Sequence, residues 1–71
     1  MEFDYSKLRG RIKEIYGTQD NFADALNMGR VSLSQRLTGK LEFTQEEIMK
    51  SCELLKFDPS EISSYFFTPV V

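Results

Sequence analysis

The fold is decided by residues 18–40, which read TQDNFADALNMGRVSLSQRLTGK. Thr18 can cap a helix that ends near Leu26. Residues 27–29 then interrupt the periodicity, and the Asn at the start of this break tolerates the left-handed backbone that a tight turn needs. A second helix is predicted from Arg30 to about Leu37. Two short helices joined by a three-residue turn form a helix-turn-helix arrangement.

One helix is predicted before this stretch. The Asp4 carboxylate can accept hydrogen bonds from the first free backbone N–H groups, and Gly17 ends the helix. Leu8, Ile12 and Ile15 fall on one face of this helix, which we expect to face the core.

Two helices are predicted after it, and both carry local start signals. Thr44 and Glu47 form a capping box, and the helix that they open should end near Lys56. Asp58 can cap a last, short helix, with Pro59 at the first helical position, where its missing N–H costs nothing. We therefore predict an all-α fold of five helices, built as one domain over residues 3–67.

Residues 68–71 form a short apolar C-terminal tail, because Pro69 cannot continue a helix. The sequence offers this tail no obvious partner within the chain. Two interpretations stay open: a frayed end, or an arm that packs on a second subunit.

The composition argues against catalysis and metal binding. The 71 residues include no histidine and one cysteine, so the usual general base and the commonest metal ligand are both missing. Cys52 lies on an apolar helix face and is interpreted as a core residue. We expect no enzyme activity, no cofactor and no metal. No apolar run approaches the ~18 residues of a membrane helix, and the acidic start does not look like a signal peptide, so we expect a cytoplasmic protein with no membrane contact.

The charges are distributed unevenly along the chain. The formal net charge is −2, but residues 1–40 sum to +2 and residues 41–71 to −4. A net negative charge argues against simple binding to nucleic acid, so any such contact must come from the first half of the chain.

The stretch from Thr18 to Lys40 resembles, without a gap, the Cro/CI-type helix-turn-helix of the XRE family. The resemblance extends from about Phe3 to Thr68 and is to the short, single-domain Cro-like proteins of prophages. The chain departs from the usual pattern in the turn, where Asn27 replaces a Gly. It also carries Ile12 and Leu37 where many relatives have a buried Arg–Glu pair, and an apolar pair packs there without the cost of desolvating charges.

The resemblance implies a five-helix, lambda-repressor-like domain whose second motif helix reads the major groove of DNA. If Leu33 and Leu37 point inward, Val31 and Gln35 lie on the opposite face, and Arg30 can reach the same groove. The predicted base contacts are Arg30, Val31 and Gln35. The predicted phosphate contacts are Gln19, Ser32, Ser34, Thr38 and Lys40. Arg36 lies near the core margin of the helix and is interpreted as an ion-pair residue instead.

A monomer with so few basic residues should bind DNA only modestly, so a homodimer on a palindromic operator is expected. The predicted dimer interface is Tyr65, Phe67, Val70 and Val71, the largest apolar excess without a necessary partner in the chain. The leading function hypothesis is therefore a phage-type repressor that binds double-stranded operator DNA. The alternative is a protein-interaction module of the same fold, such as an antitoxin-like or anti-repressor partner, which would use the acidic C-terminal half.

Overall fold

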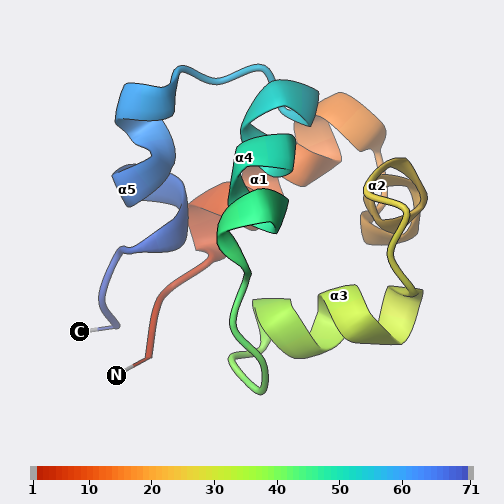
Figure 1. The fold of residues 1–71 in the computed structure, drawn as a ribbon, viewed down its shortest axis with the longest axis horizontal. Helices are drawn as coiled ribbons and strands as arrows, with labels where there is room; N and C mark the ends of the chain where they lie inside the picture. The colour runs from red at the N-terminus through yellow and green to blue at the C-terminus, as the bar shows by residue number, and fades with distance from the viewer. Residues whose placement is uncertain (1, 71) are drawn as a thin grey trace.

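The computed structural model describes residues 2–70, and they form five α-helices and one short 3₁₀ helix (Figure 1). The elements are α1 (Ser6–Tyr16), α2 (Gln19–Ala25), α3 (Arg30–Leu37), α4 (Gln45–Leu54), η1 (Pro59–Glu61) and α5 (Ile62–Phe66). The all-α, five-helix architecture agrees with the prediction. Within the described part of the chain, no helix is long and apolar enough to cross a membrane.

Every α-helix contributes to a single core of buried side chains. The buried apolar residues are Leu8, Ile12, Phe22, Ala23, Leu26, Leu33, Leu37, Ile48, Cys52, Leu55, Phe57, Tyr65 and Phe66. Ile12 and Leu37, the two positions where the resemblance led us to expect an apolar pair, are 2 % and 4 % exposed. Burying these side chains is the main favourable contribution to stability in so small a fold.

The first helix ends before Gly17, as predicted, but it starts later than expected and turns a different side to the core. α1 starts at Ser6, and the Asp4 carboxylate accepts hydrogen bonds from the Ser6 backbone N–H (2.8 Å) and hydroxyl (2.6 Å). Ile15, predicted to face the core, is 37 % exposed. Tyr16 covers the core instead: its ring packs on Phe22, with centroids 5.4 Å apart. The prediction for Ile15 was wrong because this residue lies in the last turn of α1, where no neighbouring helix covers its side.

The turn between α2 and α3 has the predicted form. The Thr18 side chain caps α2 by accepting from the Asn21 N–H at 3.1 Å. Asn27 adopts the left-handed conformation with φ 56°, which bends the chain sharply after α2. Met28 packs against the core from inside the turn. The turn therefore fixes α3 against α2.

The predicted capping box at Thr44 and the predicted cap at Asp58 are both present, and the cap at Asp58 is also a capping box. Thr44 and Glu47 exchange reciprocal hydrogen bonds at the start of α4, at 2.9 and 3.1 Å. Asp58 accepts from the Ser60 N–H, and Glu61 accepts from the Asp58 N–H. This second box opens a 3₁₀ turn that continues into α5, where the sequence predicted one uniform helix.

The C-terminal tail has a partner within the chain. The Asp4 N–H donates to the Thr68 carbonyl at 2.7 Å, and the Val70 N–H donates to the Glu2 carbonyl at 3.2 Å. Phe3 and Pro69 form an isolated antiparallel bridge, so the two ends of the chain lie side by side next to α5 (Figure 1). The expectation that the tail lacks a local partner was wrong, because this pairing joins the two extremes of the sequence.

Candidate functional site: two interaction surfaces

The first candidate surface is the outer side of α3, which lies along one edge of the molecule (Figure 1). Val31 is 72 % exposed and Gln35 is half-buried, while Leu33 and Leu37 are buried on the opposite side. We call this surface the α3 face and define it by five residues: Arg30, Val31, Ser34, Gln35 and Thr38. Arg30, Val31 and Thr38 on this face are open to solvent.

The residues predicted to contact phosphate differ in their exposure. Thr38 and Lys40 are exposed, and Gln19, Ser32 and Ser34 are half-buried. The Thr38 hydroxyl donates to the Ser34 carbonyl at 2.9 Å, so its hydrogen is already used inside the chain. Thr38 can therefore accept a hydrogen bond, but it has no free donor for a phosphate.

Acidic side chains next to the α3 face hold Arg30. Its guanidinium lies 3.6 Å from the Asp20 carboxylate and 3.8 Å from the Asp24 carboxylate, both on α2. All three side chains are more than half exposed, so the pairs are weak and screened by salt. Sequence analysis did not find this contact. Arg30 must leave both carboxylates before it can bind a guanine.

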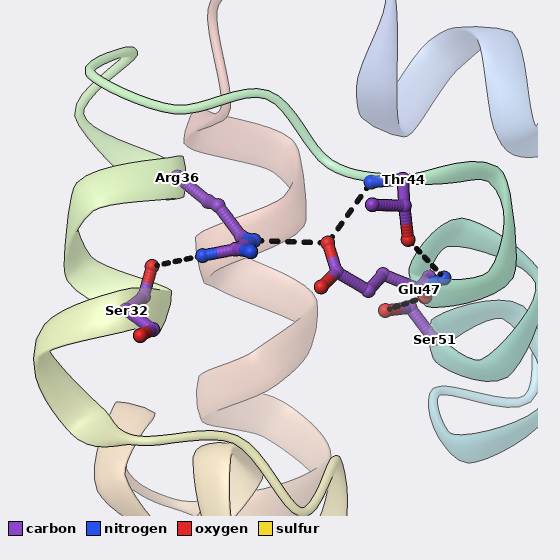
Figure 2. Close-up of polar contacts among 5 residues, drawn as sticks. All are labelled: Ser32, Arg36, Thr44, Glu47 and Ser51. Carbon is purple, nitrogen blue, oxygen red and sulfur yellow. Dashed lines mark hydrogen bonds and ion pairs between the residues drawn. The ribbon is translucent and has the colours of Figure 1, made fainter.

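Arg36 forms the ion pair expected of it, and Figure 2 shows that the pair joins α3 to α4. The Arg36 Nε lies 2.9 Å from Glu47 Oε1, and its Nη1 donates to the Ser32 carbonyl at 3.0 Å. Burial of the Glu47 carboxyl acts to raise its pKa. Hydrogen bonds from the Arg36 guanidinium and the Thr44 N–H outweigh that effect, and the pKa is lowered overall.

Two other arginines are also engaged inside the chain. Arg9 donates to the Leu37 carbonyl at the end of α3 (2.9 Å). Arg11 donates to the Leu55 carbonyl (2.9 Å) and is paired with Glu14. Much of the positive charge counted in residues 1–40 therefore stabilises the fold, and less of it is free to meet a phosphate backbone.

The residues predicted for a dimer interface separate into three groups. Phe67 and Val70 are 47 % and 53 % exposed and lie on the surface, whereas Val71 lies outside the described residues. Tyr65 is 7 % exposed, and its ring stacks on Phe57 with centroids 4.2 Å apart. Tyr65 is thus a core residue. The prediction failed there because the short α5 turns its Tyr65–Phe66 side inward.

The second candidate surface is an apolar hollow of about 210 Å³, which we call the aromatic hollow. It is lined by Phe3, Tyr5, Glu42, Phe43, Gln45, Ile48, Phe66 and Phe67. Phe43 stands at its centre, with ring contacts to Tyr5 (5.5 Å) and Phe66 (5.1 Å). The rings of Phe3 and Phe67 pack edge-on, with centroids 5.5 Å apart. Three separate parts of the chain build the hollow, so sequence analysis did not find it.

The hollow is apolar with an acidic rim. Among the residues from 2 to 70 that line it, Glu42 alone is charged. A smaller neighbouring hollow of about 70 Å³ is lined by Glu2, Phe3, Tyr5, Gly39, Leu41 and Glu42, which adds a second carboxylate and no cation. Burial, helped by the charge of Glu42, raises the pKa of the Tyr5 hydroxyl. The surface suits an apolar side chain flanked by a positive charge.

With no histidine in the sequence, the carboxylates and Cys52 are the side chains that could ligate a metal. Across residues 2–70, no group of three or more metal-ligating side chains comes together. Cys52 is 4 % exposed, and its thiol donates to the Phe57 carbonyl. Burial, with the nearby charge of Asp58, raises the pKa of the Cys52 thiol, which makes it a poor nucleophile.

The fold and these two surfaces define a small, all-helical protein. The chain belongs to the family described as "Protein of unknown function (DUF739)", whose model matches residues 1–69. Its structure is similar to the solution structure of the modulator of repression (MOR) of the temperate bacteriophage TP901-1 from Lactococcus lactis. The sequences are 40 % identical, the match covers 94 % of this chain and 90 % of that one, and the TM-score is 0.83. No curated protein matches the chain significantly.

Proposed function

We propose that this protein regulates repression in a phage-type genetic switch by binding a protein partner through the aromatic hollow. The observation that carries the proposal is the hollow itself, an open cluster of aromatic rings at the surface of a very small fold. Exposed apolar patches rimmed by polar groups are typical of protein interaction sites. The similarity to a protein named a modulator of repression supports the regulatory role.

The charge of the chain favours a basic protein partner over DNA. The net charge is −2, residues 41–71 sum to −4, and Asp20 and Asp24 flank Arg30 on the α3 face. DNA-binding proteins carry basic surfaces, so a DNA-binding repressor is a partner of suitable charge. In this scheme the protein is an anti-repressor that lowers the amount of repressor free to bind its operator.

The exposed α3 face supports a second candidate function, direct reading of operator DNA. Val31 is 72 % exposed, and the Leu33 and Leu37 side chains that anchor α3 face the other way. On this proposal the chain is a Cro/CI-type repressor of the XRE family. Arg30, Val31 and Gln35 contact bases, and two copies pair through Phe67 and Val70 on a palindromic operator.

One pair of matched variants separates the two functions. Phe67→Ser removes an exposed aromatic from the hollow, and Val31→Ser removes an exposed apolar side chain from the α3 face. Binding would be measured by calorimetry against the repressor encoded in the same genome and by gel retardation of DNA from its promoter region. We expect Phe67→Ser to weaken repressor binding by roughly 30-fold and Val31→Ser to leave it unchanged.

The opposite pattern overturns the leading proposal. Salt-sensitive DNA retardation that is lost in Val31→Ser, together with no binding of the parent chain to the repressor, would establish operator reading instead. Phe67→Ser would then weaken retardation as well, because Phe67 lies in the dimer contact of that proposal. Because both variants change exposed side chains, their circular dichroism and unfolding curves should match those of the parent chain, which excludes misfolding as the cause.

A further inference from the structure

We infer that Arg36 is a positioning residue that fixes α3 to the start of α4, residues 43–47, which we call the Phe43–Glu47 corner. The α3 face and the aromatic hollow therefore keep one relative arrangement. Only the importance of these two surfaces rests on the proposed function. The mechanical link itself is a property of the fold and is tested without any partner.

The link runs through one carboxylate oxygen that serves two parts of the chain (Figure 2). Glu47 Oε1 accepts from Arg36 Nε on α3 and from the Thr44 N–H at the end of the α3–α4 loop, each at 2.9 Å. Arg36 also binds its own helix, because Nη1 donates to the Ser32 carbonyl. The guanidinium therefore spans from a mid-helix carbonyl of α3 to the capping box of α4.

The corner that Glu47 holds belongs to the aromatic hollow. Thr44 directly follows Phe43, whose ring contacts Tyr5 and Phe66. Any displacement of the Thr44 backbone moves this ring, and any tilt of α3 is transmitted to Glu47 through Arg36. The side chains of Arg36 and Glu47 are only 16 % and 20 % exposed, so water competes with the bonds far less than at a surface pair.

Lysine cannot replace Arg36 in this role. A guanidinium offers several donors in a fixed plane, so one group reaches the Ser32 carbonyl and Glu47 together. An ammonium at the end of a flexible chain keeps the charge but loses this two-sided geometry. Arg36→Lys thus separates positioning from simple charge pairing.

The chain provides a matched control in Arg11. Its guanidinium also bridges two helices, donating to the Leu55 and Lys56 carbonyls at the end of α4 and pairing with Glu14, and its side chain is 25 % exposed. Arg11→Lys removes a similar two-sided contact at a site remote from the Phe43–Glu47 corner.

The experiment is amide hydrogen exchange of the full chain, read residue by residue by NMR, for the parent, Arg36→Lys and Arg11→Lys. In Arg36→Lys we expect exchange at Thr44 and in the last turn of α3 to rise at least about tenfold, with α1 and α5 unchanged. The Phe43 ring resonances should shift in the same variant. In Arg11→Lys the faster exchange should be confined to the end of α4.

Three outcomes would overturn the inference. Exchange that rises uniformly in all helices would make Arg36 an ordinary stabilising residue, and unchanged exchange would give it no role. Identical exchange patterns in the two lysine variants would show that Arg36 has no particular effect on the Phe43–Glu47 corner. If Arg36→Lys fails to fold, Glu47→Gln is measured instead, and the same local pattern is expected. Failure of the proposed function would leave this exchange pattern intact, since no partner is present.

Discussion

Single residues with left-handed backbone shape the loops of this protein. Asn27 and Lys56 both have φ 56°, and each follows a helix of the core. For a residue with a Cβ this conformation costs about 1–2 kcal/mol, less for Asn, whose side chain tolerates it. Asn27 also closes the turn by donating its N–H to the Asp24 carbonyl.

Substitutions at Asn27 should therefore follow backbone preference. Asn27→Ala should lower the free energy of unfolding by about 1 kcal/mol, because alanine adopts the left-handed region less readily. Asn27→Gly should leave it unchanged or raise it slightly. Urea denaturation followed by circular dichroism measures both. Equal destabilisation by the two changes would mean that the Asn side chain, and not the backbone, stabilises the turn.

The aspartates around Arg30 allow a test of the second candidate function at the same scale. Asp20→Asn with Asp24→Asn releases the guanidinium and removes two negative charges beside the α3 face. If this face reads DNA, affinity for double-stranded DNA should increase several-fold, and its dependence on salt should become steeper. Fluorescence anisotropy at two salt concentrations measures both effects.

Glu53→Gln serves as the control, because Glu53 is exposed on α4, a different helix. The control removes one negative charge where the double variant removes two, so an increase half as large in the logarithm of the affinity would reflect net charge alone. No response in either variant would argue that the α3 face does not meet DNA.

At the scale of elements, the features predicted correctly from the sequence are those that depend on contacts between residues close in the chain. The helix starts follow from Thr18, Thr44 and Asp58, whose side chains bond N–H groups two or three residues away. Ile15 and Tyr65 were placed wrongly, because their burial depends on which helix crosses them. Contacts of this kind join distant parts of the chain, and helical periodicity does not specify them.

The same difference between local and long-range contacts explains why one candidate surface was predicted and the other was not. The α3 face was predicted because Val31 and Gln35 share one side of one helix. The aromatic hollow was not predicted, since it needs the pairing of the chain ends that brings Phe3 next to Phe67. The only local signal for it was the surplus of aromatic residues after Phe57.

The capping box of α4 makes a prediction at this scale. Thr44→Ala removes the hydroxyl that accepts the Glu47 N–H and should lower the free energy of unfolding by about 1 kcal/mol. Thr44→Ser keeps that acceptor and should cost a few tenths of that amount at most. Thermal and urea unfolding of the two variants measure the difference. Equal losses would assign the effect to the methyl group of Thr44 and not to the cap.

At the scale of the whole molecule, the pH dependence of stability comes from carboxylates at the starts of helices. Asp4 and Asp58 have lowered pKa values, chiefly because they accept hydrogen bonds from Ser6 and Ser60, and the pKa of Glu47 is lowered as well. These groups stand at the starts of α1, η1 and α4. With no histidine in the chain, no imidazole contributes to the pH dependence of stability.

Acid should therefore unfold the protein through these carboxylates. A group whose pKa is lower in the folded state stabilises the fold fully above its unfolded pKa, and the contribution is lost as pH falls through the folded value. The unfolded pKa values are near 4.5 for Glu47 and 3.8 for the aspartates, so the free energy of unfolding should be constant near neutral pH and should fall when the pH drops below these values.

Glu47→Gln should be less stable than the parent chain at pH 7, and the difference should shrink in acid, where the parent also loses this charge. Urea unfolding across the acid range measures both curves, and a difference that stays constant with pH would contradict the assignment of the lowered pKa to the Arg36–Glu47 pair.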